Sequence, residues 1–525
     1  MKIEERHGLL KVTFIVSIIA IMCKLLGFVR EAIIASYYGA NSATDAFFFS
    51  QSMPGMLFPA VCNSFSTAFI SIYVTKYVQD DVNDSDMFAS KSLITAIGIS
   101  IFLSILAVIF APHIVPIFAP GFMGNTLSSA IHLTRLTMSS FVLSMIQYML
   151  SAILNSRKLF YFSQISGLMS NVFIIIVTII LGRNQSIDML TITVIGGNII
   201  RVILLIYYCK KSEVMLTLIA NPFDIEVKRV IMLALPILLG NSIVQVNNIV
   251  DKALASNLTE GAISALSYSG ALNNMVISIF ITSLSTVLYP TLTEYISIGN
   301  IELYSKSLIN SILTLTMILL PISIITIIFS QEIVSLVFKR GNFNEIATSL
   351  TSTALTYYAI MYVFYAIREV IIRGFYAIKD TKTPMINGVL GVLINIIFSL
   401  LFVEYIGIAG IALGTSISSI VTAILLILSA RRKLINIKLY VIFSPLIKFI
   451  IASAIMIISM TTFTNLVYIT NMCIRLSLVT IIGFISYLGT LILLKYDQLL
   501  LLLKRCKNNL LCAMRRGQNN VTNKR

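Results

Sequence analysis

The stretch CKLLGFVREAIIASYYGANSATDAFFF, residues 23–49, places charged side chains in a segment that otherwise has the composition of a membrane-spanning helix. Lys24, Arg30 and Glu31 lie within two helical turns of one another, and Asp45 begins the next apolar run. A Lys or Arg at the centre of a membrane helix costs about 2.5 to 3.5 kcal/mol, so such residues face a protein interior or a water-filled cavity. The stretch therefore predicts a membrane protein with a polar interior.

The composition of the whole chain predicts the same class of protein. Its 525 residues are 57% hydrophobic and 11% charged, whereas a soluble domain carries about 25% charged residues. Apolar runs long enough to cross a hydrocarbon layer recur from end to end, and a β-barrel would instead show short alternating segments. We predict an all-α, polytopic membrane protein with about fourteen transmembrane helices. The predicted spans are 12–36, 46–74, 88–111, 127–154, 160–182, 187–209, 229–251, 261–290, 305–329, 345–372, 383–404, 406–430, 439–463 and 472–494.

The basic residues predict the orientation of the chain in the membrane. With the N-terminus in the cytoplasm, 27 of the 38 Lys and Arg residues fall on the cytoplasmic side. The outer side receives Arg183, Lys252, Lys339, Arg340 and Arg475. Because cytoplasmic loops are enriched in Lys and Arg, both termini are predicted to be cytoplasmic. The same distribution accounts for the net charge of +16 without a nucleic-acid partner.

The chain resembles itself at an offset of about 220 residues. EAIIAS at 31–36 matches DKALAS at 251–256, and SFSTAFISIYVTKY at 64–77 matches SLSTVLYPTLTEY at 283–295. Six spans per copy give two like-oriented lobes, with a substrate cleft expected between them, as in transporters with parallel repeats. The predicted division is a first lobe at 1–220, a second lobe at 221–435, two further spans in 436–495 and a basic cytoplasmic tail at 496–525.

The charges of the first span form a stripe. On an ideal helix Lys24 and Glu31 project within about 20° of each other, and Gly27 lies on the same side. Arg presents a fork of donors suited to phosphate and Lys a point charge, so the stripe predicts a cleft for an anionic ligand such as a pyrophosphate. The alternative is structural, with Lys24 reaching toward the interface and Arg30 paired with Glu31 or Asp45.

The turn after the first span contains helix-starting residues. Ser42 followed by Asp45 resembles a capping box with Asp in the place of Glu, and Thr44 is a second candidate for the N-cap. Asp45 would then favour the positive end of the dipole of the second span. Together with Glu31, it is expected to hold the basic groups in position.

The corresponding span of the second lobe carries a different polar face. Asn241, Gln245, Asn248 and Asp251 follow one another at spacings of four, three and three residues, so they share one side of a helix. Such a face suits a cation or sugar hydroxyls better than a phosphate, although hydrogen bonding between helices is an equal alternative. Residues that could face the same space are Asn273, Asn274, Asn395 and Thr415.

Motifs of enzymatic chemistry are not found in the sequence. Its six Cys residues form no C-x-x-C pair, its three His residues show no metal-ligand spacing, and no phosphate-binding G-x-x-x-x-G-K-[ST] loop occurs. The outer loops are short, as in VEYIG at 403–407. We therefore expect a transporter rather than an enzyme, with no cofactor, no confident metal site, and coupling to membrane potential or to a Na⁺ or H⁺ gradient.

Three stretches carry a family resemblance. KLLGFVREAIIASYYGANSATDAFFFSQSMPGMLFPAVCNSFSTAFI at 24–70 resembles the N-terminal signature of the MurJ/MviN family, the lipid II flippases of the multidrug, oligosaccharidyl-lipid and polysaccharide exporter superfamily. VDKALASNLTEGAISALSYSGALNNMV at 250–276 and GFYAIKDTKTPMINGVLGVLINIIFSLLF at 374–402 resemble two further family segments. The resemblance implies a bacterial cell-membrane protein with fourteen helices and a cationic central cavity. It also implies movement of undecaprenyl-pyrophosphate-linked peptidoglycan precursor from the inner to the outer leaflet for cell-wall synthesis.

The resemblance assigns residues as well as a fold. It implies that Lys24, Arg30 and Asp45 are functionally important, although the family usually has Arg at the first position. The family often has Arg on the second span, where this chain has Phe58 and Pro59, and on the eighth, where it has Ala271. The cavity is therefore expected to be less cationic than usual. A flippase for another polyprenyl-pyrophosphate glycan and a drug/cation antiporter remain as alternatives to a lipid II flippase.

Some relatives are thought to bind sodium near the seventh, eleventh and twelfth spans. By resemblance, Asp251, Asn395 and Thr415 are candidates for such a site here, with Asn248 on the same polar face. The Asp that the family pattern expects four residues after Asn395 is Ser399 in this chain.

Overall fold

The computed structural model describes residues 3–79, 82–182, 186–217, 224–433, 442–467 and 469–500. Every regular element in these ranges is helical, and they contain no strand. The predicted all-α class is therefore confirmed. The basic tail beyond residue 500 and the loop that holds Arg183 lie outside the described residues.

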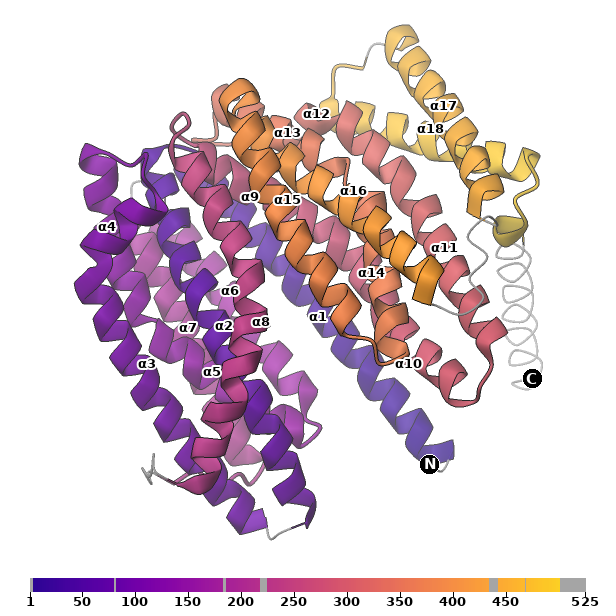
Figure 1. Cartoon of the computed structure of the whole chain (residues 1–525). Coiled ribbons are helices and arrows are strands. Elements are labelled where there is room, and N and C mark those ends of the chain that lie inside the picture. The colour runs from indigo at the N-terminus through magenta and orange to yellow at the C-terminus, as the bar shows by residue number, and fades with distance from the viewer. Residues whose placement is uncertain are drawn as a thin grey trace, which may run out of the picture. The chain divides into compact units, whose positions relative to one another are not determined.

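Each predicted span corresponds to one or more helices in the described ranges (Figure 1), although the start of the span 439–463 lies outside them. The first six spans correspond to α1 (Ile3–Tyr38), α2 (Ser42–Gln79), α3 (Val82–Phe118), α4 (Gly124–Ser139) with α5 (Phe141–Ser156), α6 (Phe160–Leu181) and α7 (Ile187–Lys211). The next six correspond to α8 (Ile225–Ser256), α9 (Ala262–Val276) with η1 (Ile277–Thr282) and α10 (Ser283–Ser297), α11 (Ile301–Ile328), α13 (Glu345–Ala359) with α14 (Tyr362–Ala377), α15 (Lys382–Ile406) and α16 (Ile408–Lys433). The short α12 (Ser330–Phe338) precedes α13, and α17 (Phe443–Leu466) and α18 (Met472–Leu493) complete the chain.

Ten helical segments of the described chain are long and apolar enough to cross a membrane, or eleven if α13 and α14 count as one span. The helices α1, α2 and α8 are not among them. The multi-pass membrane class follows from these segments, whereas the number fourteen stays a prediction.

The described residues divide into two compact units. Unit 1 comprises Met1–Ile279, Val337–Tyr358 and Gly388–Ser418, and unit 2 comprises Phe280–Leu336, Ala359–Asn387 and Ser419–Arg525. Unit 1 thus combines helices from both predicted lobes. The lobe boundaries at residues 220 and 435 stay a prediction.

Within unit 1, α1 packs along α6 and α2 packs along α8 (Figure 1). The capping box at the start of α2 lies one residue earlier than predicted. Asn41 Oδ1 accepts hydrogen bonds from the N–H groups of Ala43 (3.0 Å) and Thr44 (3.1 Å), and Thr44 Oγ1 accepts one from the Asn41 N–H (2.8 Å). Asn41 and Thr44 therefore satisfy one another reciprocally, which leaves the Asp45 carboxylate free for another partner.

A buried ion pair joins several helix ends of unit 1. The Asp86 carboxylate pairs with the Arg157 guanidinium, and the two side chains are 3% and 8% exposed. The second Asp86 oxygen accepts from the Met215 N–H at 2.8 Å. Arg157 donates from Nε to the Tyr73 hydroxyl at 3.0 Å and from a terminal nitrogen to the Ser212 carbonyl at 3.2 Å. The network ties α2, α3, the end of α5 and the segment after α7 together on the predicted cytoplasmic side.

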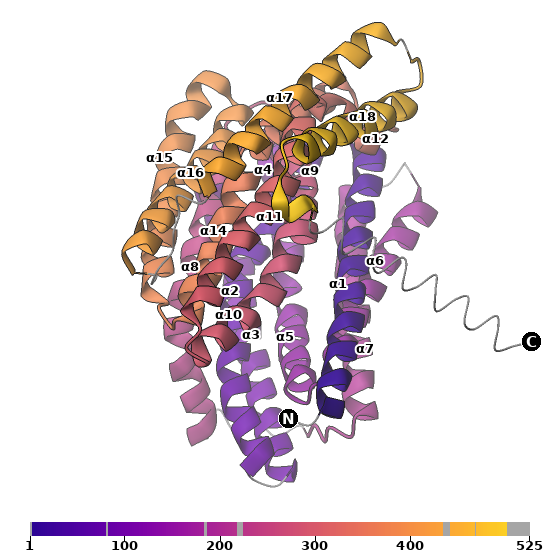
Figure 2. The same cartoon turned by 90° about the vertical axis from the view of Figure 1, so that its right-hand side faces the viewer.

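Unit 2 has its own apolar core. The helices α17 and α18 pack against each other and against α11 (Figure 2). The shared core includes Leu313, Phe449, Met456 and Tyr487, each 3% exposed or less. A hydrogen bond from the Tyr304 hydroxyl to the Gly374 carbonyl (2.9 Å) fixes α11 against α14.

Candidate functional site

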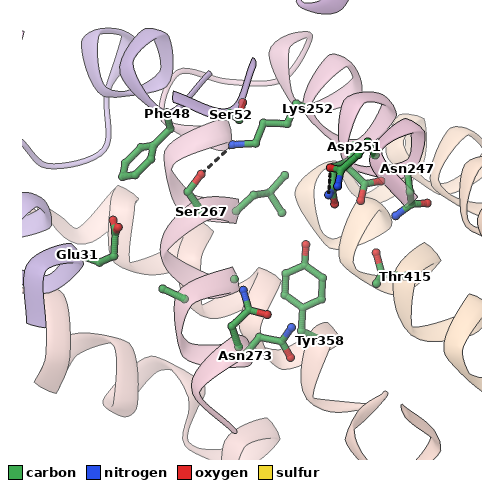
Figure 3. Close-up of a pocket in the computed structure, with 16 residues that line it drawn as sticks. Glu31, Phe48, Ser52, Asn247, Asp251, Lys252, Ser267, Asn273, Tyr358 and Thr415 are labelled. Carbon is green, nitrogen blue, oxygen red and sulfur yellow. Dashed lines mark hydrogen bonds between the residues drawn. The ribbon is translucent and has the colours of Figure 1, made fainter. Parts of the chain in front are cut away.

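A cavity of about 540 Å³ lies inside unit 1 (Figure 3). Helices α1 and α2 contribute one part of its lining, and α8, α9, α13 and α16 contribute the rest. Most of its lining residues are polar or charged, which is unusual for the interior of a membrane protein and makes the cavity the candidate functional site. The lining residues include Glu31, Phe48, Ser52, Gln245, Asn247, Asn248, Asp251, Lys252, Ser267, Asn273, Asn274, Tyr358 and Thr415.

The polar face predicted on the second lobe does reach this cavity. Gln245, Asn248 and Asp251 line it, whereas the side chain of Asn241 lies outside the described residues. Asn273, Asn274 and Thr415 line it as well, as the sequence analysis allowed. Figure 3 shows Asp251, Asn247 and Thr415 together, across the space from Glu31 and Phe48.

Oxygen atoms converge at one side of the cavity, around Asn395. This side chain is buried (2% exposed), and one atom of its amide lies 2.9 Å from Asn247 Oδ1 and 3.2 Å from Asp251 Oδ1. With the amide nitrogen in that place, Asn395 donates to both oxygens, and its own oxygen accepts from Thr415 Oγ1 at 2.9 Å. With the amide oxygen there, three oxygens would meet, and a cation between them or a proton on the Asp251 carboxyl would be needed to join them. Asn247 was not among the residues predicted for this site.

The first-lobe stripe is arranged around a single ion pair. Arg30 donates to Glu31 Oε1 at 2.7 Å and to Asn171 Oδ1 of α6 at 3.1 Å. The Asn171 amide also donates to the Cys23 carbonyl at 3.3 Å, so it binds α1 at two points. Glu31 lines the cavity. Arg30 is half-buried and Lys24 is exposed, and neither of these two basic residues lines the cavity.

Asp45 corrects the expected pairing, because it binds the start of α9 rather than the basic residues of α1. Its carboxylate is 5% exposed and accepts from the N–H of Gly261 (2.7 Å), the N–H of Ser264 (2.7 Å) and the Ser264 hydroxyl (2.6 Å). The first N–H groups of a helix lack partners within the helix and carry its positive dipole end, so a carboxylate is well placed there. Asp45 therefore caps a helix whose N-cap residue, Gly261, lies 216 residues further along the chain.

Contacts around Asp45 hold three chain segments together; we call Gly39, Asp45, Gly261, Ser264 and Tyr268 the Asp45 junction. The Tyr268 hydroxyl donates to the Gly39 carbonyl at 3.0 Å. Gly261 has φ +88°, and a Cβ there would lie 2.8 Å from the Ala40 carbonyl oxygen, so only glycine fits. Beside the junction, the N–H of Asn342 donates to the Ser36 carbonyl at 2.9 Å. The Asn342 side-chain amide also donates to the Tyr37 carbonyl at 2.6 Å, so two of the last carbonyls of α1 are satisfied by a loop far along the chain.

An aromatic cluster connects the Asp45 junction to the cavity. The ring of Phe48, a lining residue, lies 5.0 Å from that of Tyr268, which in turn lies 5.3 Å from Phe338 and 5.6 Å from Phe343. The contacts of Tyr268 with Phe48 and Phe343 are edge-to-face, and such contacts add to the stability gained by burial. The predicted outer end of the cavity is therefore covered by packed rings and by the junction.

Lys252 is a cavity residue that the sequence analysis placed in an outer loop. It lies in the last turns of α8, and its Nζ lies 3.1 Å from Ser267 Oγ of α9 (Figure 3). The predicted span ended at residue 251, and a helix end read from sequence is uncertain by a few residues. The helix continues to Ser256, which turns Lys252 inward.

The two positions that lack the arginines expected of the family have apolar neighbours. Phe58 is buried and stacks on Phe141, with ring centroids 3.6 Å apart. Ala271 and its neighbour Gly270 line the cavity and leave space there. An uncharged side chain therefore lines the cavity at position 271.

Comparison with known proteins identifies the family. A family model described as the lipid II flippase MurJ matches residues 34–487. The chain belongs to the MurJ lipid II flippase family. The probable lipid II flippase MurJ of Buchnera aphidicola subsp. Acyrthosiphon pisum is 28% identical over 92% of this chain and 96% of its own length. Its counterpart in Rickettsia prowazekii is 27% identical over 77% of this chain and 80% of its own.

Solved structures agree with the family assignment. The lipid II flippase MurJ in an inward closed conformation superposes with a TM-score of 0.81 at 25% identity, covering 92% of this chain and 99% of that one. An inward-facing multidrug transporter of the MATE family superposes with a TM-score of 0.69 at 15% identity, over 79% and 95% of the two chains. The latter shows a shared fold alone. The resemblance to MurJ is thus confirmed, and with it the class of transporter rather than enzyme.

Proposed function

We propose that this chain moves a lipid-linked peptidoglycan precursor of the lipid II type across the bacterial cell membrane, from the inner to the outer leaflet. The observation that carries the proposal is the family match over residues 34–487, together with a polar cavity inside unit 1. Translocation breaks no covalent bond, so the protein needs only a polar path for the headgroup while the prenyl tail stays in lipid. Both termini are proposed to be cytoplasmic, as the distribution of basic residues predicts.

The proposed mechanism is alternating access. In this structure the Asp45 junction and its aromatic cluster cover the cavity on the proposed outer side. Release to the outer leaflet then requires the hydrogen bonds between Asp45 and α9 to break. Glu31 holds Arg30 beside the cavity, and an arriving pyrophosphate would compete with this carboxylate for the guanidinium. Lys24, exposed on the same stripe, would add a second positive charge.

Replacement of Arg30 tests the proposed role of the stripe. Arg30→Ala removes one charged hydrogen bond to Glu31 and one to Asn171, and we expect transport to fall about tenfold or more. The measurement is the growth of cells depleted of their own lipid II flippase and supplied with the variant, after its amount in the membrane has been checked. Arg135→Ala, an exposed arginine on α4, is the control and should behave as the unaltered chain. Full growth with Arg30→Ala would exclude Arg30 from the mechanism.

We also propose that a cation binds where Asn247, Asp251 and Asn395 meet, with Thr415 beside them. Hard cations prefer oxygen ligands, and transporters of related design bind coupling ions where helices meet near the substrate site. Asp251 supplies the one formal charge, and no group of three or more His, Cys, Asp or Glu side chains in the described ranges could hold a metal ion. The residues therefore fit a monovalent ion such as Na⁺ better than a transition metal. Ser399, buried next to Asn395, adds no charge.

The cation proposal predicts that Asp251→Asn loses sodium binding. The carboxylate is the charged ligand, and its amide keeps the shape without the charge. Radioactive sodium bound to the purified protein is measured against a choline background, with Asp188→Asn on the exposed start of α7 as control. Equal sodium binding by Asp251→Asn and the unaltered chain would disprove the site. Transport that follows pH and ignores sodium would assign the coupling to protons.

A drug/cation antiporter is the alternative that the MATE-type fold raises. It predicts protection of cells against cationic drugs, which a susceptibility screen with the same strains would detect. A flippase for another polyprenyl-pyrophosphate glycan would instead fail to restore growth in cells depleted of their lipid II flippase while moving its own substrate.

A further inference from the structure

Among the residues that the structure describes, Lys252 is the one lysine or arginine that lines the cavity. Its Nζ lies 3.1 Å from Ser267 Oγ, and Figure 3 shows the side chain reaching across from α8 to α9. An ammonium group carries three donors. Ser267 Oγ also donates to the Ile263 carbonyl at 2.8 Å, so its hydroxyl accepts from Lys252 with one lone pair. Two ammonium donors remain for the cavity.

The carboxylates near Lys252 are already engaged elsewhere. Glu31 pairs with Arg30 at 2.7 Å, and Asp45 accepts three hydrogen bonds at the start of α9. Asp251 faces Asn395 at 3.2 Å. None of the ion pairs found in the described part of the chain includes Lys252. Lys252 is half-buried, and a lysine charge inside a membrane protein without an ion-pair partner is costly, so its retention points to a ligand.

The cavity wall beside Lys252 leaves room for that ligand. Gly270 and Ala271 follow Ser267 by one helical turn on α9 and also line the cavity. A Cβ added at Gly270 would meet no atom within 4 Å. The amides of Asn273 and Asn274 continue the lining and offer neutral donors to oxygen atoms. Lys252 thus stands at the edge of an open, donor-rich surface.

We propose that Lys252 binds the phosphate oxygens of the substrate on the second-lobe wall of the cavity, and so supplies from α8 the positive charge that Ala271 does not supply from α9. This inference rests on the proposed function, because it names the part of the substrate that the cavity binds. A lysine is a point charge on a flexible stem, so it accepts a phosphate in several orientations. Lys252 is then a specificity-determining residue that separates anionic from neutral lipids.

The test compares binding of undecaprenyl pyrophosphate and of neutral undecaprenol to the purified protein in lipid nanodiscs. Lys252→Gln should weaken undecaprenyl pyrophosphate binding about tenfold or more while leaving undecaprenol binding unchanged, because only the former makes charge-assisted hydrogen bonds. Lys252→Arg should retain binding. Lys211→Gln, an exposed lysine at the end of α7, is the control and should not change it.

A rescue variant separates ligand binding from a structural role of the charge. Lys252→Gln combined with Ala271→Arg returns a cation to the cavity from α9, and pyrophosphate binding should recover. Equal pyrophosphate binding by Lys252→Gln and the unaltered chain would overturn the Lys252 proposal and leave the proposed function standing. Absence of pyrophosphate-selective binding by the unaltered chain would instead overturn the proposed function. Loss of both lipids in Lys252→Gln, with no recovery in the double variant, would make Lys252 purely structural.

Discussion

Asp45→Ala is expected to abolish transport while the protein still inserts into the membrane. The carboxylate accepts three short hydrogen bonds from Gly261 and Ser264 at the start of α9. Hydrogen bonds to a charged group contribute about 1.5 to 3 kcal/mol each, so the loss of three should cost the closed junction about 4.5 kcal/mol or more. A tenfold change in population needs only about 1.4 kcal/mol. The variant should therefore rarely occupy the state in which the proposed outer side is closed.

Hydrogen exchange at α9 measures this effect directly. The amides of Gly261 and Ser264 should exchange faster in Asp45→Ala, because their acceptor is gone and the helix start frays. Asp84→Ala is the matched control, since Asp84 is an exposed carboxylate in the first turn of α3. Unchanged exchange together with normal growth of flippase-depleted cells would show that Asp45 does not hold the junction closed.

Asp86→Ala is expected to destabilise the fold by about 3 to 5 kcal/mol, because it leaves the Arg157 guanidinium buried without its partner. The substitution also leaves the Met215 N–H without its acceptor, which is the second carboxylate oxygen of Asp86. The purified variant in detergent should therefore melt at a clearly lower temperature than the unaltered chain. Glu345→Ala breaks the exposed pair with Lys339 and should cost about 1 kcal/mol or less.

A double variant tests whether the stranded charge causes the loss. Asp86→Ala combined with Arg157→Met removes the buried guanidinium and should be less destabilised than Asp86→Ala alone. If the double variant melts below both single variants, the hydrogen bonds of Arg157 to Tyr73 and Ser212, rather than its charge, stabilise this end of unit 1.

The fold class could be predicted from the sequence because each membrane helix is indicated by the composition of its own segment. About 20 apolar residues in a row determine a span whatever lies elsewhere in the chain. The polar face of α8 was predictable for a similar reason, since Gln245, Asn248 and Asp251 share a side by spacing alone. Asn395 and Thr415 were only candidates for the same space, and family resemblance grouped them with Asp251, because no local pattern reports which helices pack together.

The partners of Asp45 and Arg30 show where sequence reasoning stops. Asp45 lies close to Arg30 in the chain, so local pairing was the natural expectation. Its true partners are more than 200 residues away. Arg30 likewise binds Asn171, 141 residues along the chain, in addition to the adjacent Glu31. Long-range contacts depend on how helices pack, and a single sequence does not record them.

Lys252 was misplaced for a different reason. The predicted span ended at residue 251, one residue before Lys252, because the apolar pattern of α8 ends at Val250. The internal repeat held a usable signal, because its counterpart in the first lobe, Ala32, follows Glu31 inside α1. If the helix limits of the first repeat had been applied to the second repeat, Lys252 would have been predicted inside α8.

The most direct test of the central claim is the fraction of lipid II in the outer leaflet of cells that rely on this chain. Cells depleted of their own flippase are supplied with the unaltered chain or with an empty vector, and lipid II is probed from outside with a reagent that does not cross the membrane. The account predicts that the chain restores the externally accessible fraction and that the vector does not. An accessible fraction that stays at the depleted level, with the chain inserted in the membrane, would contradict it.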